Sequence, residues 1–257
     1  MNKIIFTGTA PGLPSASRAS SSWILKTAGA IYQFEAGEGV ASALLKHRID
    51  HKEIDAVFIS HLHPDHITGI FLELQLMYLT AREKPLDIYV PEEAVEGLGK
   101  TADMSYLFKE KFPFEFAFKP IRPNPIYRAG DFELLAYHND HLTPNAATIK
   151  RYQKPNKMQS YSFLFRIRNK KVLYSGDVLN EHELEDLLDD IHTVIVEGLH
   201  VDFGAIIRLC VDNKVSRLVI THAGDKIIER PDRLLRLAEK AGLQKIVIAT
   251  DGLQLNL

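Results

Sequence analysis

Short apolar runs, rich in β-branched and aromatic side chains, recur along both halves of the chain and predict buried β-strands. Apolar residues at helical spacing separate many of these runs. Strands that alternate with helices, together with several strand–strand hairpins, predict a layered α/β protein with mixed β-sheets. The predicted strands are Ile4–Thr7, Trp23–Lys26, Ala30–Glu35, Ala56–Ser60, Ile88–Val90, Phe132–Tyr137, Ser162–Ile167, Lys171–Ser175, Thr193–Val196, Arg217–Thr221 and Lys245–Thr250.

Three helical segments are predicted in the second half of the chain. One begins at Asp202, which is a favoured N-cap residue type. Another runs from Pro231 to Gly242, with apolar residues along one face and a glycine at its end. The segment Glu181–Asp190 contains six acids and predicts the exposed face of a further helix.

Composition narrows the function classes. The 257 residues are 46% hydrophobic and 25% charged, without linker or repeat, so we expect a single domain over residues 1–257. A net charge of −2 provides no global field that attracts nucleic acid or anionic lipid. The single cysteine excludes an internal disulfide framework and a cysteine-based zinc site. No apolar run approaches about 18 residues and no signal-peptide core is present, so we expect a cytoplasmic protein without membrane contact.

The sharpest chemical feature directly follows the predicted strand Ala56–Ser60: it is the segment His61-Leu-His63-Pro-Asp65-His66. If the strand continues, His61 and His63 are two residues apart and point to the same side. The proline then forces a turn, so Asp65 and His66 enter the next helix with a different heading. Three imidazoles and a carboxylate within six residues suit zinc, manganese or iron. Since these groups would be costly to crowd together without a partner, we expect a metal site here.

Three more candidate ligands lie at the carboxyl ends of later predicted strands: His141, Asp177 and His222. One rim of the protein could therefore gather all of them. His138 is the alternative to His141, because on an extended segment the two face opposite ways and only one can be a ligand. We choose His141 because it lies at the turn just before Pro144.

In this order, the motifs resemble the metallo-β-lactamase fold and, within it, the branch of the tRNA 3′-processing endonuclease, tRNase Z. The resemblance covers nearly the whole chain. Glu35 stands where the branch usually has an aspartate. The matching segments are Thr7-Gly-Thr9 with Gly12, Pro14, Arg18 and Ser21, then Glu35-Ala-Gly37-Glu-Gly39, His61–His66, Asp140-His141-x-x-Pro144, Ser175-Gly-Asp177 and Thr221-His222.

The resemblance implies a four-layer αββα sandwich of two mixed β-sheets flanked by helices. It also implies two divalent metal ions, zinc or manganese with iron as a further option, and a hydroxide that bridges them. The bridging hydroxide would attack the substrate, and Asp65 is implied both as a ligand and as a group that orients the nucleophile. The implied ligand sets are His61, His63 and His141 for one metal and Asp65, His66 and His222 for the other, with Asp177 bridging both.

A weaker signal is the segment Glu197-Gly-Leu-His200, which follows the predicted strand Thr193–Val196. His200 lies 22 residues before His222, the separation found in the branch between a catalytic histidine and the last ligand. The resemblance implies that His200 donates a proton to the leaving oxygen and that Glu197 fixes its ring. The alternative is a histidine at a helix start, next to the N-cap Asp202.

The tRNase Z branch also carries a long arm that grips tRNA, inserted between the third and fourth motifs. Here His141 and Asp177 are only 36 residues apart, so the arm is missing. The shortened segment is basic, since residues 150–171 contain eight Lys and Arg and no acid. We predict that Lys150, Arg151 and Lys154 bind substrate phosphate. The alternative is a solvated basic loop.

Three functions are compatible with these features. The first is a dinuclear metal phosphodiesterase that cleaves a small nucleotide-like or sugar phosphodiester. The second is a tRNA 3′-processing or other RNA endonuclease that uses the basic insert in place of the arm. The third is a hydrolase of a thioester, a lactone or a β-lactam that uses the same metal pair. A homodimer is expected only because the branch commonly forms one.

Overall fold

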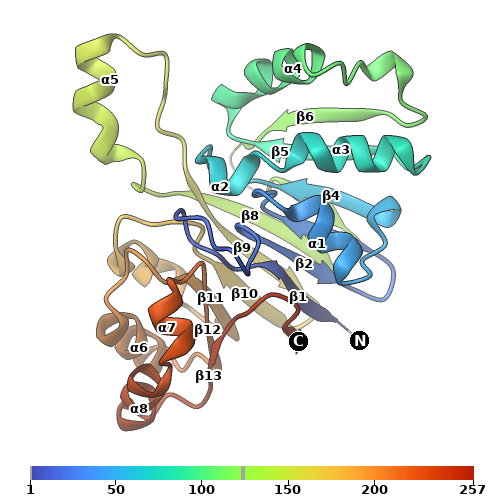
Figure 1. Ribbon diagram of the computed structural model, residues 1–257. Coiled ribbons are helices and arrows are strands. Elements are labelled where there is room, and N and C mark those ends of the chain that lie inside the picture. Colours follow the sequence, from blue (N-terminus) through green and yellow to red (C-terminus); the bar gives the residue numbers. More distant parts are fainter. Residues whose placement is uncertain (1, 123–124) are drawn as a thin grey trace. The chain divides into compact units, whose positions relative to one another are not determined.

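The computed structural model describes residues 2–122 and 125–257. The chain divides into two compact units. The first unit combines Met1–Ile121 with Thr250–Leu257, and the second comprises Arg122–Ala249. Each unit has its own β-sheet and its own helices (Figure 1). The assignment of residues 1–257 to one domain stays a prediction.

The first unit is built on a seven-stranded mixed sheet with the strand order β14-β1-β2-β3-β4-β5-β6. Strands β14, β1, β2 and β3 pair antiparallel, whereas β3, β4, β5 and β6 pair parallel. The strands are β1 (Lys3–Gly8), β2 (Ser22–Lys26), β3 (Ile31–Phe34), β4 (Ile54–Phe58), β5 (Leu86–Val90), β6 (Phe116–Pro120) and β14 (Gln254–Asn256). The helices are α1 (Val40–Lys46), α2 (Pro64–Ile67), α3 (Ile70–Leu79) and α4 (Val95–Met104), with short 3₁₀ helices η1 (His51–Glu53), η2 (Glu92–Ala94) and η3 (Lys109–Lys111).

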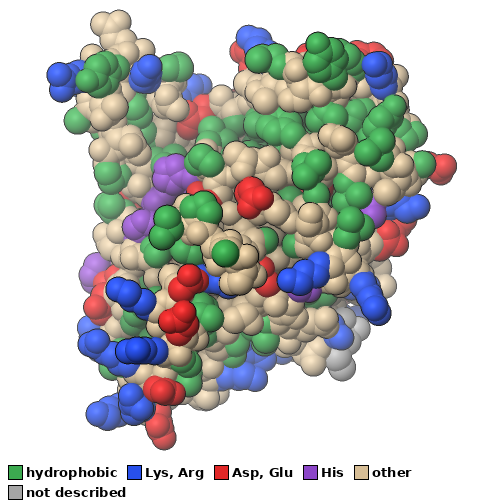
Figure 2. Space-filling view, viewed as in Figure 1, with side chains coloured by type: hydrophobic (Ala, Val, Ile, Leu, Met, Phe, Trp, Pro, Cys, Tyr) green, Lys and Arg blue, Asp and Glu red, His purple; other side chains and the backbone are tan. Residues whose placement is uncertain are grey.

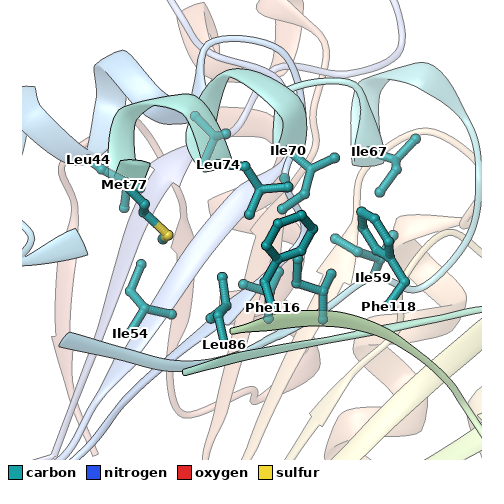
Figure 3. Close-up of a cluster of buried hydrophobic side chains, with 14 of the residues drawn as sticks. Leu44, Ile54, Ile59, Ile67, Ile70, Leu74, Met77, Leu86, Phe116 and Phe118 are labelled. Carbon is teal, nitrogen blue, oxygen red and sulfur yellow. The ribbon is translucent and has the colours of Figure 1, made fainter. Parts of the chain in front are cut away.

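Apolar packing in the first unit fixes the position of the histidine-rich segment. Figure 3 shows part of the buried cluster, in which Leu74 and Met77 of α3 belong to the same core as the sheet residues. Ile59 and Ile67 flank the segment 61–66 on its two sides and are both buried in this cluster. Because burying an isoleucine side chain contributes about 1.5–3 kcal/mol, the segment is held at both ends by the hydrophobic core.

The second unit holds another seven-stranded mixed sheet, with the strand order β13-β12-β11-β10-β9-β8-β7. Strands β10 to β13 pair parallel, and β7 to β10 pair antiparallel. The strands are β7 (Tyr127–Ala129), β8 (Phe132–His138), β9 (Tyr161–Ile167), β10 (Lys170–Tyr174), β11 (Thr193–Glu197), β12 (Arg217–Thr221) and β13 (Ile246–Ile248). The helices are α5 (Ala146–Tyr152), α6 (Phe203–Asp212), α7 (Asp225–Glu229) and α8 (Asp232–Ala241), with 3₁₀ helices η4 (Thr143–Asn145) and η5 (Glu181–Leu187).

The helices of the second unit begin and end at the residues that the sequence indicates. The Asp202 side chain accepts a hydrogen bond from the backbone N–H of Ala205 at the start of α6. Gly242 ends α8 with a φ of 80°, a left-handed conformation that glycine adopts without steric cost. Both predictions are confirmed. In contrast, α5 has no buried residue, and it extends away from the end of β8 before the chain returns to β9 (Figure 1).

Two mixed sheets flanked by helices are confirmed, and so is each of the predicted strands, with small shifts at their ends. The prediction for Glu181–Asp190 is wrong in part. The regular structure is the 3₁₀ helix η5, which ends at Leu187, and Glu181 is buried rather than exposed. The pattern could not indicate this burial, because Glu181 accepts a hydrogen bond from the backbone N–H of Asp202, a residue distant in sequence.

A buried carboxyl group in the first unit makes stability depend on pH. Glu73 of α3 is fully buried, and its Oε2 accepts a hydrogen bond of 2.8 Å from Nε2 of Gln33. Burial raises the pKa of Glu73 from its ordinary value of 4.5 to about 7. Because the folded state binds this proton more tightly than the unfolded state, protonation of Glu73 stabilises the folded protein, and this stabilisation is complete below about pH 4.5. This contribution, about 3 kcal/mol, is lost as the pH rises through about 7.

We expect Glu73→Gln to raise the free energy of unfolding by about 1–3 kcal/mol at pH 8, because the neutral amide avoids the cost of a buried charge. At pH 4.5 the variant and the parent protein should unfold at nearly the same denaturant concentration. Urea unfolding at the two pH values measures this difference, with the exposed Glu239→Gln as the control. Equal gains at both pH values would show that folding does not raise the pKa of Glu73.

Candidate functional site

The first unit gathers three imidazole rings and one carboxylate. β4 ends at Phe58, so His61 and His63 follow it in a loop and the condition of a continued strand is not met. Their rings nevertheless lie close together, with centroids 4.7 Å apart, and the rings of His61 and His66 are 4.2 Å apart. Asp65 and His66 lie on α2, as predicted, with Asp65 Oδ2 3.5 Å from His66 Nε2.

Glu35 explains why the strand ends early. Its carboxylate accepts hydrogen bonds from the backbone N–H of Ser60, at 3.1 and 3.3 Å, so this N–H does not continue the sheet. The same carboxylate lies 3.5 Å from Nδ1 of His66. Glu35 is fully buried and has a φ of 59°, a left-handed conformation that is sparsely populated outside glycine. Glu35, which replaces the usual aspartate, thus contacts both ends of the segment that carries the histidines.

The second unit places its candidate residues at the carboxyl ends of its strands. His141 follows β8, Asp177 follows β10 and His222 follows β12. Because β10, β11 and β12 are parallel and β8 runs in the same direction, these ends lie along one edge of the sheet. All three side chains are buried. His138, the alternative to His141, is exposed at the end of β8, beside Tyr161.

Asp177 occupies the centre of this set. Its Oδ2 lies 3.7 Å from Nε2 of His141 and 3.5 Å from Nε2 of His222. Both distances exceed a normal hydrogen bond, and they suit nitrogen and oxygen atoms that share a bound cation. His222 has a φ of 50°, so its backbone also adopts the left-handed conformation. A carboxylate oxygen that lies between two imidazoles is compatible with the shared-ligand role expected for Asp177.

Glu197 and His200 form a hydrogen-bonded pair at the end of β11. Nδ1 of His200 lies 3.0 Å from Oε1 of Glu197. The buried Glu197 carboxylate also accepts hydrogen bonds from the backbone N–H groups of His200 and Leu199, so its position is fixed. The rings of His200 and His141 are 5.0 Å apart. His200 is partly exposed, as a group that exchanges protons with a substrate must be.

Two residues that the sequence analysis missed hold the ligand loops of the second unit. Asn139 is buried; its Oδ1 accepts a hydrogen bond from the backbone N–H of His141, and its Nδ2 donates to Oγ of Ser162. Glu183 accepts hydrogen bonds from the backbone N–H groups of Asp140, at 2.5 Å, and Leu179, at 2.7 Å. Glu183 therefore ties the loop that carries His141 to the loop after Asp177. The sequence of the acidic segment Glu181–Asp190 does not indicate that Glu183 accepts these backbone hydrogen bonds.

Glu183→Gln is expected to weaken divalent metal binding about tenfold, because the amide keeps one acceptor oxygen and puts a donor where the second backbone N–H points. Glu185→Gln is the control, since Glu185 lies on the same 3₁₀ helix and contacts His182 instead. Calorimetric titration of metal into both variants measures the effect. Identical affinities would show that Glu183 does not position the ligand loops.

The predicted substrate-binding residues form a separate group. Lys150 and Arg151 lie on α5 and Lys154 follows it, and all three side chains are exposed. The Arg151 guanidinium lies 5.2 Å from the ring centre of Tyr152. These cations therefore lie on or next to an exposed helix rather than among the buried ligands, and their role stays a prediction.

The donor chemistry fits divalent metal ions. Each unit offers buried imidazole nitrogens and a carboxylate oxygen at short mutual distances, which is the ligand set of zinc and manganese sites. The only cysteine, Cys210, is buried in α6, where burial raises the pKa of its thiol to about 12. Thiolate ligation is therefore excluded, and metal binding depends on histidine and aspartate.

Comparison with known proteins places the chain in a family. The model of the family described as Anti-Pycsar protein Apyc1 matches residues 2–226. The chain belongs to this family. The match includes every candidate ligand and the Glu197–His200 pair, whereas α8 and most of α7 lie beyond it.

The chain is also similar to proteins named Ribonuclease Z. The one from Methanocaldococcus jannaschii is 34% identical over 155 residues, which cover 60% of this chain and 49% of the relative. The one from Methanosarcina acetivorans is 22% identical over 308 residues, which cover 100% of this chain and 98% of the relative. The chain thus spans about half the length of the first relative and nearly all of the second.

Solved structures confirm the expected fold. The metallo-β-lactamase fold protein YhfI from Bacillus subtilis matches with a TM-score of 0.78 and 19% identity, covering 99% of this chain and 98% of that one. Human tRNase Z, short form, matches with a TM-score of 0.77 and 19% identity, with the same coverage. The family member therefore has the metallo-β-lactamase fold. Within residues 2–122 and 125–257, no helix is long and apolar enough to cross a membrane.

Proposed function

We propose that the protein is a metal-dependent phosphodiesterase that cleaves a small nucleotide-like or sugar phosphodiester. The observation that carries the proposal is the position of the Asp177 carboxylate between His141 and His222, which suits a ligand shared by two metals. The proposed ligand sets are His61, His63, His141 and Asp177 for one metal and Asp65, His66 and His222 for the other, with Asp177 shared by both.

The proposed chemistry combines the metals with fixed side chains. When bound, divalent ions would supply a water of lowered pKa and would neutralise charge on phosphoryl oxygens. Asp65, besides being a ligand, orients the attacking water by accepting its hydrogen bond. Nε2 of His200 donates a proton to the departing alkoxide oxygen, while Glu197 holds Nδ1 and thereby fixes the tautomer and the ring orientation.

The names of the relatives support a hydrolase that acts on phosphoester bonds. Ribonuclease Z appears as the name of relatives over the full chain, and a solved diphosphatase of the PhnP family shares the fold with a TM-score of 0.70 and 14% identity. A small substrate is favoured because the connection between β8 and β9 contains only the short η4 and the seven-residue helix α5 in place of a long arm. A homodimer and a cytoplasmic location stay predictions.

Substrate binding by α5 is a separate part of the proposal. A seven-residue helix without buried side chains is marginal by itself, so contact with another molecule would stabilise it. A triple charge reversal is expected to raise KM about 10–100-fold with a smaller change in kcat, because charge-assisted phosphate contacts are lost. The triple variant combines Lys150→Glu, Arg151→Glu and Lys154→Glu. The control reverses three exposed lysines elsewhere: Lys26, Lys46 and Lys214. Equal KM values in both triple variants would exclude α5 as a substrate-binding element.

The second candidate function is processing of tRNA 3′ ends, which is favoured by the full-length relative named Ribonuclease Z. The third is hydrolysis of a thioester or lactone. A substrate panel distinguishes the three: bis(p-nitrophenyl) phosphate and small nucleotide diesters, a precursor tRNA, and a thioester with a lactone, each with manganese or zinc. The proposal predicts the highest kcat/KM for a small diester. Cleavage of precursor tRNA at higher kcat/KM, or activity confined to carboxylic esters, would overturn it.

A further inference from the structure

A cavity in the second unit lies outside the proposed metal site. It has a volume of about 600 Å³ and is bordered by the start of α6 and by α7 and α8. This volume falls within the range of small-molecule sites. A neighbouring hollow of about 340 Å³ between α6 and α8 shares Gly204 and Leu237 with it, so the two adjoin at these residues. We call this feature the α6–α8 groove.

The α6–α8 groove combines apolar walls with a ring of cations. Phe203, Leu234 and Leu237 contribute apolar surface to the larger cavity, and Leu237 is 39% exposed. The cations of this cavity are Lys226, Arg230 and Arg233, and its one acid is Asp202, whose side chain already accepts the N–H of Ala205. An apolar cavity with excess positive charge suits an occupant with the opposite charge and an apolar body.

The three cations of the larger cavity are not held in ion pairs within the described residues. In the part of the chain that the structure describes, no carboxylate lies within ion-pair distance of Lys226, Arg230 or Arg233. The adjoining hollow adds Arg208 and Lys240 against one further acid, Asp212. The groove therefore carries a local excess of positive charge on a chain whose net charge is −2. Figure 2 shows Lys and Arg side chains gathered over the region of α6, α7 and α8 in Figure 1.

We propose that the α6–α8 groove is a binding site for a small organic anion with an apolar or aromatic body. Arg230, Arg233 and Lys226 would contact the anionic group, and Phe203, Leu234 and Leu237 would contact the body. The groove walls begin two residues after His200 and four residues after His222, at Asp202 and Lys226. An occupant therefore contacts segments that directly follow two residues of the proposed active site, without depending on their chemistry.

The test uses 1-anilinonaphthalene-8-sulfonate, a fluorescent aromatic anion, as the probe. Titration in 0.15 M salt is expected to give one site per chain, with a dissociation constant in the micromolar range. Arg230→Glu with Arg233→Glu should weaken binding at least tenfold. Leu237→Asn should weaken it severalfold, because it removes apolar wall while leaving every charge in place. The matched control is Arg236→Glu with Lys245→Glu, two exposed cations that do not line the groove.

Two simpler probes test whether charge and apolar surface act together. Inorganic phosphate carries charge alone and 1-naphthol carries aromatic surface alone, so each should displace the probe at least tenfold less effectively than an unlabelled aromatic sulfonate. Equal probe affinity in all variants would overturn the proposal, as would displacement by phosphate alone at similar concentrations. Thermal unfolding of each variant confirms that it is folded. None of these outcomes depends on bound metal or on hydrolytic activity.

Discussion

Asp177→Ala is expected to remove metal binding and hydrolytic activity together. Asp177 Oδ2 lies within 3.7 Å of imidazole nitrogens on both His141 and His222, so its loss would affect both proposed metals. Removing a residue that only supports a ligand already costs about 10–100-fold in metal affinity or activity. The loss for a shared ligand should therefore exceed 100-fold in kcat/KM. Metal analysis of the purified variant and its diester hydrolysis measure the two effects.

Asp189→Ala is the matched control for this change, because Asp189 is an exposed aspartate of the same unit. His63→Ala should behave like Asp177→Ala, although it alters the other unit. An Asp177→Ala protein that retains its full metal content would contradict the bridging role. A protein that retains metal and loses activity would indicate that Asp177 acts in the reaction and not as a shared ligand.

His200→Ala is expected to keep the bound metal and to lower turnover according to the leaving group. General acid catalysis contributes about 10²–10⁴-fold, and this contribution is needed most when the departing group is a poorly acidic alcohol. Hydrolysis of an alkyl phosphodiester should therefore fall by about that factor, whereas release of p-nitrophenolate should change little. Steady-state kinetics with a pair of diesters that differ only in the leaving alcohol measure the difference.

Glu197→Gln tests whether Glu197 supports proton donation by His200 or only packs against its ring. The glutamine keeps the size of the side chain but no longer offers two acceptor oxygens to Nδ1 of His200 and the backbone N–H groups of Leu199 and His200. It should show the same leaving-group dependence as His200→Ala with a smaller loss. Full activity of His200→Ala on an alkyl diester would show that another group protonates the leaving oxygen.

The sequence predicts most of the fold and the candidate ligands because both depend on local patterns. Strands such as Thr193–Glu197 appear as short apolar runs, and His61–His66 places four metal donors within one segment. The order of the motifs then indicates the remaining ligands. These features need no knowledge of contacts between distant parts of the chain.

The features that the sequence does not predict depend on distant contacts. The end of β4 at Phe58 follows from the hydrogen bond between Glu35 and the backbone of Ser60, which are 25 residues apart. Glu183 accepts a hydrogen bond from the backbone N–H of Asp140, which lies 43 residues away in the sequence. Glu73 accepts one from the side chain of Gln33, which lies 40 residues away. Glu183 and Glu73 look like ordinary surface acids in the sequence, since only the folded chain supplies their partners.

The most direct test of the proposed function is the metal content of protein purified without chelator, measured together with hydrolysis of bis(p-nitrophenyl) phosphate. The proposal predicts about two divalent ions per chain and diester cleavage that chelation abolishes and manganese or zinc restores. Protein that binds no metal and gains no activity when manganese or zinc is supplied would contradict the proposal.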